Sequence, residues 1–161
     1  MQTPVGTLLL AASDAGLELV QFEESRHARQ IAPDWQHDKE ARHPLLTQAT
    51  TELTEYFAGE RRRFTIPLNA GGTEFQQRVW AGLAEIPYGE TLDYKGLAAG
   101  IGSPHAVRAV GAANGRNPLP IVVPCHRVVG SNGSLTGFAG GLGIKRFLLE
   151  HEGALAEELA V

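Results

Sequence analysis

This chain of 161 residues contains a single cysteine, Cys125, and that count limits how the fold can be stabilised. One cysteine can form neither an intramolecular disulfide nor a zinc knuckle, so a disulfide scaffold and a zinc finger are excluded. The fold therefore depends on a hydrophobic core. The composition allows one, because 43% of the residues are hydrophobic and 20% are charged, as in ordinary globular proteins.

Membrane and secretory proteins are disfavoured by the distribution of apolar residues. No apolar run approaches the roughly 20 residues that a membrane helix needs. Residues 1–4 lack the basic and apolar regions of a secretory signal, and a lone thiol is suited to a reducing compartment. We therefore expect a cytoplasmic protein with no membrane partner.

Charge is unevenly distributed along the chain. The formal net charge is −4, which by itself disfavours nucleic acid as a partner. Residues 92–130 nevertheless hold four basic side chains and one acidic, a balance of +3, while the other ten basic and seventeen acidic side chains give −7. This basic stretch indicates a local phosphate-binding face, with chance clustering of four cations as the alternative.

The N-terminal third is predicted to form an antiparallel hairpin followed by a helix. Residues 7–12 and 17–22 are short apolar or alternating runs separated by turn-forming residues, and residues 23–42 have the polar composition of a loose connection. Apolar side chains then recur at helical spacing over residues 43–57. Residues 64–68 predict an edge strand, because the proline within them cannot donate to a neighbouring strand.

A glycine-containing linker at residues 69–72 separates this region from a mostly helical one. We place the domain boundary there, which gives an N-terminal domain of residues 1–70 and a C-terminal domain of residues 71–161. The second domain is expected to open with a helix that Thr73 caps and that Pro87 stops.

Two short helices follow, joined by a turn that contains glycine. The first spans residues 94–99 and is closed by Gly100. The second runs from about residue 105 to residue 115, with Ser103 as its cap and Pro104 at its first position. This arrangement matches a helix-turn-helix, although many helical bundles contain such a corner.

The C-terminal third is expected to hold a strand, a loop and a helix. Residues 121–123 predict a short strand that ends just before Cys125. Residues 130–143 contain six glycines, which predicts a loop that closely approaches another group. The last helix is expected to have an apolar face formed by Ile144, Phe147 and Leu148.

Cys125 has neighbours that suit a nucleophile. A thiol is reactive as its thiolate, and the adjacent His126 can remove the proton directly or through one water. A neutral imidazole then needs an acceptor that orients its other nitrogen, for which Glu150 and Glu152 are both candidates. The alternative is an inert buried cysteine, since free cysteine is among the most buried residue types.

Residues 121–129, with the sequence IVVPCHRVV, resemble the active-site signature of the O6-alkylguanine-DNA alkyltransferases, the methylated-DNA–protein-cysteine methyltransferases. The close resemblance extends over residues 73–153, and the opening hairpin is more weakly similar to the small N-terminal domain of that family. Further segments agree in order and spacing: residues 73–80, 86–91, 108–111, 114–118 and 148–153.

The resemblance implies a role for each matching residue of the reaction centre. Cys125 corresponds to the alkyl acceptor and His126 to the histidine that deprotonates it through water. Glu152, rather than Glu150, corresponds to the carboxylate that orients this histidine. Asn117 corresponds to the asparagine that braces the turn before the active site, and Tyr94 to the tyrosine that protonates guanine N3 as the base leaves.

The resemblance also implies a DNA-binding surface and a substrate pocket. Arg108 corresponds to the arginine that fills the gap left by a flipped nucleotide. Ala139 stands where certain relatives have serine, but the family contact there is largely a backbone N–H, which alanine keeps. The expected DNA-binding residues are Ala106, Arg108, Ala109, Arg116 and Tyr94, and the expected pocket residues are Val128, Phe138, Ala139 and Gly140.

The fold implied by the resemblance is α+β. It has a small N-terminal α/β domain, ribonuclease H-like with a hairpin-type sheet and a helix, followed by a helical domain with the helix-turn-helix and the cysteine. The implied function is DNA repair by irreversible, single-turnover alkyl transfer from O6-alkylguanine, and also O4-alkylthymine, to Cys125. We expect a monomer that binds the minor groove of double-stranded DNA with the damaged base flipped out, without cofactor or metal.

Two other functions are weighed against this one. A non-catalytic damage-binding protein like the alkyltransferase-like proteins would lack the acceptor cysteine, so Cys125 argues against it. A cysteine hydrolase with a Cys-His-Glu triad would turn over an ester or amide, and it would leave the helix-turn-helix unexplained.

Overall fold

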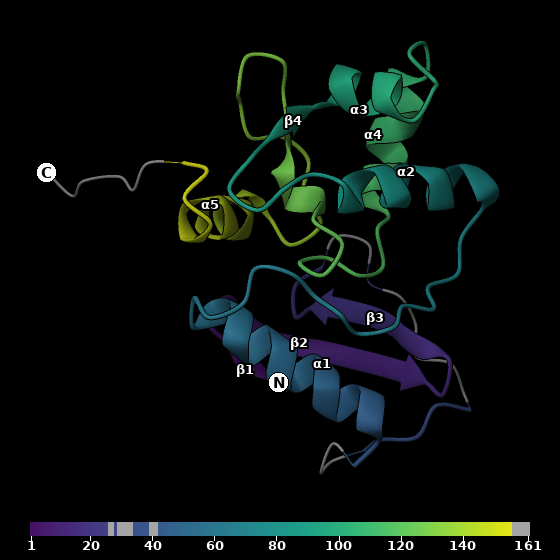
Figure 1. Cartoon of the computed structure of the whole chain (residues 1–161), viewed down its shortest axis with the longest axis vertical. Helices are drawn as coiled ribbons and strands as arrows, with labels where there is room; N and C mark the ends of the chain where they lie inside the picture. The colour runs from purple at the N-terminus through teal and green to yellow at the C-terminus, as the bar shows by residue number, and fades with distance from the viewer. Residues whose placement is uncertain (26–27, 29–33, 39–41, 156–161) are drawn as a thin grey trace, which may run out of the picture.

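The computed structural model describes residues 1–25, 28, 34–38 and 42–155. Figure 1 places a small sheet and one helix in one half of the molecule and the other helices in the second half. This is an α+β fold in which the N-terminal residues form the sheet. The expected loose connection at residues 23–42 lies partly outside the described residues.

The sheet has three antiparallel strands in the order β1-β2-β3: β1 (Gln2–Thr3), β2 (Gly6–Ser13) and β3 (Gly16–Phe22). The hairpin prediction is confirmed, with Leu8 opposite Phe22 and Ser13 opposite Gly16. Gly16 is required by a close approach, because a Cβ atom there would lie 2.8 Å from the Pro67 carbonyl oxygen.

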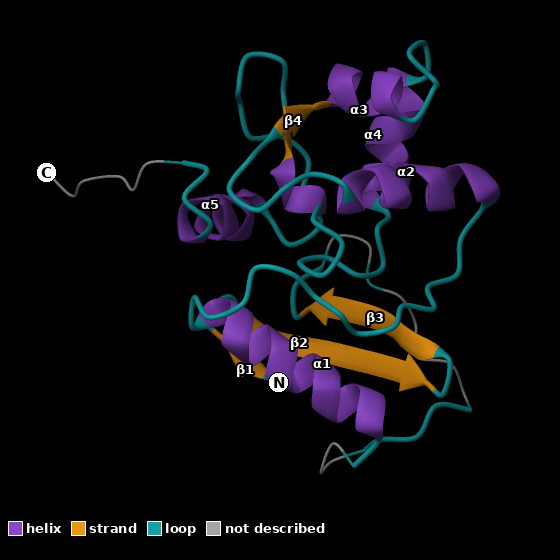
Figure 2. Ribbon diagram, in the orientation of Figure 1, coloured by secondary structure: helices purple, strands orange, loops and turns teal. Residues whose placement is uncertain are grey.

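Helix α1 (Pro44–Phe57) packs against β2 and β3, as Figure 2 shows. It agrees with the predicted helix, and Ala49, Leu53 and Tyr56 are buried beneath it. The predicted edge strand at residues 64–68 is wrong. Only Leu68 forms a bridge, with Leu17, because the backbone N–H groups of Thr65 and Ile66 donate to the buried Glu52 carboxylate instead of to a neighbouring strand.

Helix α2 (Glu74–Ala84) opens the helical half and confirms the cap predicted at Thr73. Thr73 and Gln76 exchange side-chain and backbone hydrogen bonds in a capping box. Helix α3 (Tyr94–Gly100) begins after Asp93, whose side chain accepts from the Gly96 N–H. Its start agrees with the predicted position.

Helix α4 (Val107–Gly115) packs against α2 and α3, so the helix-turn-helix is formed. The predicted cap is wrong, because the helix begins after Ala106 and no side chain caps it. The Ser103 hydroxyl accepts from Arg78 instead, at 3.3 Å, and the Ser103 carbonyl accepts from the Ala106 N–H. Ser103 and Pro104 therefore belong to the turn between the helices.

The predicted strand at residues 121–123 is also wrong, because this segment is a series of turns. Ile121 has a φ of 75°, a value that breaks an extended strand. The paired residues lie further on: β5 (Val128–Val129) is parallel to β4 (Leu92–Asp93). Between the turns and β5 lies the 3₁₀ turn η1 (Cys125–Arg127).

Helix α5 (Leu142–His151) follows the glycine-containing loop. Its buried face is formed by Lys145, Leu148 and Leu149, while Phe147 is 37% exposed and stacks on His151. The predicted apolar face is therefore wrong at Phe147. None of the helices in the described parts of the chain is long and apolar enough to cross a membrane.

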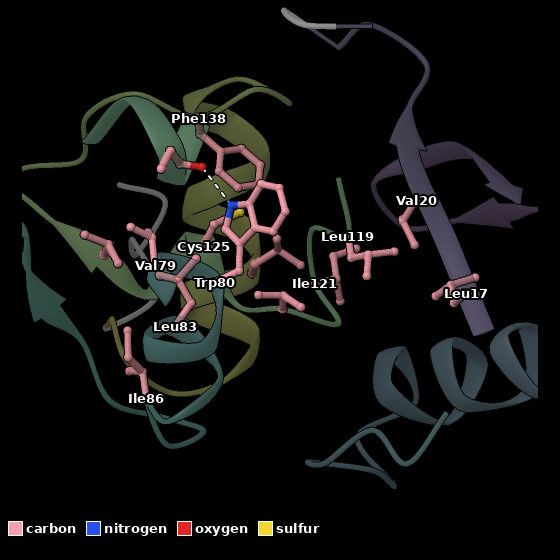
Figure 3. Packing of buried hydrophobic residues seen from close by; sticks show 14 of the residues in the cluster. Leu17, Val20, Val79, Trp80, Leu83, Ile86, Leu119, Ile121, Cys125 and Phe138 are labelled. Atoms are coloured by element: carbon pink, nitrogen blue, oxygen red, sulfur yellow. Dashed lines mark hydrogen bonds between the residues drawn. The ribbon is translucent and has the colours of Figure 1, made fainter. Parts of the chain in front are cut away.

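One hydrophobic core joins the two halves. In Figure 3, Leu119 and Ile121 lie between Trp80 on one side and Leu17 and Val20 of β3 on the other. The Trp80 indole N–H donates to the Ala113 carbonyl at 2.9 Å, which satisfies the polar atom of a buried ring. The turns that replace the expected strand therefore connect the sheet to the helices directly beside Cys125.

Candidate active site

Cys125 begins the turn η1 and is 5% exposed. Burial raises the pKa of the Cys125 thiol to about 11, while a hydrogen bond with the Asn117 side chain and the charge of Lys145 act in the opposite direction. The thiol is therefore protonated at neutral pH. A reaction at its sulfur needs a base within reach.

His126 is fully buried next to the cysteine, and one of its two ring nitrogens makes a hydrogen bond. Its Nε2 lies 2.8 Å from Oε2 of Glu152, which assigns the ring proton to Nε2. Nδ1 then carries the lone pair, and it is buried without a hydrogen-bond partner in the described structure. Burial lowers the pKa of His126 against the opposing effect of Glu152, so the imidazole is a neutral base.

Glu152 is the centre of the polar cluster. Its Oε2 accepts from His126 Nε2, from the Tyr56 hydroxyl at 2.7 Å and from Arg127 Nη2 at 3.0 Å, and its Oε1 accepts from Arg127 Nε at 2.8 Å. Burial alone would raise the pKa of Glu152, but the hydrogen bonds from His126 and Arg127 outweigh it and hold that pKa at about 2. Glu152 is therefore ionised.

Of the two candidate carboxylates, Glu152 contacts His126 and Glu150 does not. Glu150 points to Arg146 on the same helix, with an N–O distance of 3.7 Å. Glu152 caps the end of α5 and turns inward to His126. The carboxylate indicated by the resemblance is the one that contacts the histidine.

Three buried residues in or near the cluster were not among the predicted site residues: Tyr56, Arg127 and Lys145. Arg127 is 6% exposed, and its position next to the Cys-His pair could have suggested it. Lys145 is fully buried on α5 and donates to the carbonyls of Val128 and Thr136. Burial lowers the pKa of Lys145 to about 8. Tyr56 carries no sequence signal, because it lies 96 positions before its partner Glu152.

Tyr56 brings the N-terminal half into the site. Its hydroxyl contacts Glu152, and its backbone carbonyl lies 2.7 Å from Nε2 of His151. Tyr88 packs edge-on against its ring, and the guanidinium of Arg127 lies over Tyr88. The N-terminal and C-terminal halves of the molecule therefore contact each other at the Glu152 carboxylate.

Asn117 braces the turns that precede Cys125. Its Nδ2 donates to the Val123 carbonyl at 2.7 Å, and its Oδ1 accepts from the Leu119 N–H at 3.0 Å. The Asn117 side chain thus supplies backbone hydrogen bonds that this apolar segment would otherwise make with a neighbouring strand. It fixes the backbone on the approach to the cysteine.

A cavity of about 370 Å³ lies between α4 and the glycine-containing loop. A larger one, of about 460 Å³, lies between β3 and residues 115–120, and Tyr94 is not among its lining residues. Val128 is buried and Gly140 packs against Phe22, and neither lines either cavity. The smaller cavity is lined by Tyr94, Gly111, Ala112, Gly115, Arg116, Thr136, Gly137, Phe138 and Ala139.

Four of the five residues expected to contact DNA lie in or next to α4, and the fifth, Tyr94, begins α3. Arg108 and Ala109 are exposed on the helix, and Arg116 is exposed at its end. Ala106 is half-buried at the start of the helix. Of the residues in this region, Gly111, Ala112, Gly115 and Arg116 line the smaller cavity.

Two family profiles match nearly the whole chain. The ribonuclease-like domain of 6-O-methylguanine DNA methyltransferase matches residues 1–70, and the DNA binding domain of 6-O-methylguanine DNA methyltransferase matches residues 74–154. The chain belongs to this family. Its activity is accordingly DNA repair by direct alkyl transfer.

Individual members of the family are similar over most of their length. The methylated-DNA–protein-cysteine methyltransferase of Methanosarcina acetivorans is 48% identical over 153 residues, which is 95% of this chain and 96% of that protein. The constitutive enzyme of Bacillus subtilis is 47% identical over 156 residues, or 94% and 92% of the two chains. The crystal structure of Mycobacterium tuberculosis OGT in complex with DNA is 44% identical, with a TM-score of 0.87 over 96% of this chain and 91% of that one.

Family membership discriminates between the alternative functions that the sequence left open. Alkyl transfer is favoured over hydrolysis of an ester or amide, and Cys125 separates the chain from binding proteins without an acceptor. Among the residues that the structure describes, no group of three or more histidine, cysteine or acidic side chains could hold a metal ion.

Proposed function

We propose that Cys125 accepts a methyl or larger alkyl group from O6 of guanine, and also from O4 of thymine, in double-stranded DNA. The observation that supports this most directly is the hydrogen-bonded pair of His126 and Glu152 next to the thiol. A neutral His126 offers Nδ1 as a base, and the ionised Glu152 holds Nε2 at 2.8 Å. This arrangement is suited to removing one proton from a buried thiol.

The transfer begins with the thiol proton. It passes through one water to Nδ1 of His126, and Glu152 stabilises the imidazolium that results. The Cys125 thiolate then attacks the alkyl carbon, so that the S–C bond forms as the C–O6 bond breaks and its electron pair stays on the base. Tyr94 donates a proton to guanine N3, because an unprotonated guanine anion is a poor leaving group. The thioether has no easy route back to a thiolate, so each molecule reacts once.

Substrate access requires the damaged nucleotide to leave the duplex, because guanine O6 lies inside the stack. The exposed small side chains of α4, including Ala109 and Ala112, suit close approach to the minor groove. Arg108 supports the flipped state, and the cavity lined by Tyr94, Phe138 and Ala139 receives the base. We further propose a cytoplasmic monomer with its domain boundary at residues 70 and 71.

The mass of the intact protein after incubation with excess O6-methylguanine duplex tests this function. We expect one added methyl group per molecule, located on Cys125, and no further change with time. Cys125→Ser should bind the duplex but gain no mass, because the serine hydroxyl is too weak an acid for the same histidine.

Each rival function gives a different result in this experiment. Binding without any gain of mass in the wild-type protein would indicate a damage-binding protein. A methyl group on another residue, or release of methylated product over many turnovers, would contradict the acceptor role of Cys125.

A further inference from the structure

Thr136 makes two contacts with Tyr94 that the proposed mechanism does not use. The Tyr94 hydroxyl donates to the Thr136 carbonyl at 3.3 Å, and the Thr136 hydroxyl donates to the Tyr94 oxygen at 3.4 Å. Both residues line the smaller cavity. The phenol oxygen therefore has a donor, and its proton has an acceptor, before any base enters.

The Thr136 carbonyl is itself held in place by a buried lysine of α5. Lys145 Nζ donates to it at 2.8 Å and also donates to the Val128 carbonyl, so one buried ammonium ties the loop to β5. The Tyr94 side chain lies close to two glycines: a Cβ atom on Gly111 would be 3.8 Å from the ring, and one on Gly137 would be 3.8 Å from the hydroxyl. These contacts fix the position of the Tyr94 ring relative to the Thr136 carbonyl.

We propose that Thr136 is a positioning residue for alkyl transfer, whose hydroxyl orients Tyr94 and stabilises the tyrosine oxygen as that residue gives its proton to the departing base. This inference rests on the proposed function, and specifically on Tyr94 as the proton donor.

The geometry accounts for each proton in the step. At rest the phenol O–H points to the Thr136 carbonyl. When guanine occupies the cavity, that O–H turns to N3 and transfers its proton as the C–O6 bond breaks. Negative charge then develops on the phenol oxygen, and the Thr136 O–H remains directed at it. Solvent returns a proton to Tyr94, while the proton lost by Cys125 leaves through His126, so guanine gains one proton and the thiol loses one.

The size of the effect follows from the exposure of the contact. Thr136 lies at the surface, where water competes for its hydroxyl. Removing one hydrogen bond of this kind corresponds to a rate loss of about three- to tenfold. Because the hydroxyl acts after the thiolate has formed, the reactivity of Cys125 itself should not depend on it.

The test compares two alkyl donors in single-turnover assays. O6-methylguanine duplex needs protonation of its leaving group, whereas iodomethane releases iodide, which needs none. Thr136→Val removes the hydroxyl at nearly constant shape, Thr136→Ser restores it, and Ser131→Ala removes another exposed hydroxyl from the same loop. Each variant is first checked for folding by circular dichroism.

We expect Thr136→Val to slow transfer from the duplex about three- to tenfold and to leave the rate of Cys125 methylation by iodomethane within about twofold of the wild-type rate. Thr136→Ser should recover most of the loss, and Ser131→Ala should have no effect. In a Tyr94→Phe background, Thr136→Val should cause no further loss, because the group through which it acts is gone.

Several results would overturn the inference. They are an unchanged duplex rate in Thr136→Val, an equal loss with iodomethane, or a full additional loss in the Tyr94→Phe background. If Tyr94→Phe is slow while Thr136→Val is normal, the proposed function stands and only the role of Thr136 fails. If the wild-type protein gains no methyl group from the duplex, the proposed function itself fails.

Discussion

Replacing Glu152 by glutamine should destabilise the protein in a way that depends on pH. The substitution keeps the shape of the side chain but removes the charge that pairs with Arg127 and orients His126. Arg127 is buried, so the variant leaves a cation in the interior without its counter-charge. Loss of one partner from a buried ion pair typically costs about 3–5 kcal/mol.

The pKa of Glu152 gives an independent magnitude. It lies at about 2 in the folded protein against a usual value of 4.5, a difference of about 2.5 pH units that corresponds to about 3 kcal/mol. A carboxyl with a depressed folded pKa stabilises the protein fully above its unfolded pKa, and this stabilisation is lost as pH falls toward the folded value. About 2 kcal/mol of it should disappear between pH 5 and pH 3.

Urea unfolding of the wild-type protein and of Glu152→Gln at pH 7, 5 and 3 measures this contribution. We expect a difference in unfolding free energy of about 3 kcal/mol at pH 7 that narrows by about 2 kcal/mol by pH 3. A difference below about 1 kcal/mol at pH 7, or one that is constant with pH, would refute the assignment of Glu152 as the buried charged partner.

Three further substitutions probe other parts of the molecule. Tyr56→Phe should lower the unfolding free energy in urea by about 1–3 kcal/mol, because the buried carboxylate loses a donor, and an unchanged value would contradict that bond. Thr73→Ala should cost about 1 kcal/mol by opening the capping box; thermal unfolding measures it, and no loss would contradict it. Arg108→Ala should slow single-turnover repair of duplex O6-methylguanine about tenfold or more, since base extrusion costs a few kcal/mol, but spare reaction with free O6-benzylguanine; equal losses would show that Arg108 has another role.

Elements coded by neighbouring residues were predictable from the sequence. The hairpin, α1 and α2 each follow from a short pattern of apolar residues, turn residues and caps, and α2 even carries its capping box in residues 73–76. The segment at residues 121–123 failed for the opposite reason. Its apolar pattern suits a strand. However, the Asn117 side chain donates a hydrogen bond to the Val123 carbonyl, and the positive φ of Ile121 bends the backbone out of an extended conformation.

The polar cluster was predictable only in part. Cys125 and His126 are adjacent, so their chemistry can be inferred directly. Glu152 could not be separated from Glu150 by spacing, since the difference depends on how α5 ends. Tyr56 and Lys145 reach the site through tertiary packing of distant elements, and nothing near them in the sequence marks this.

The dispersed origin of the Glu152 contacts has a consequence during translation. The ribosome releases residues 56, 126 and 152 in that order, so Cys125 leaves the ribosome before the carboxylate that orients its base. A nascent chain therefore carries a thiol whose proton has no prepared acceptor. Because the proposed reaction consumes the molecule, we expect this order of release to keep the thiol weakly reactive until the surface that binds damaged DNA has folded.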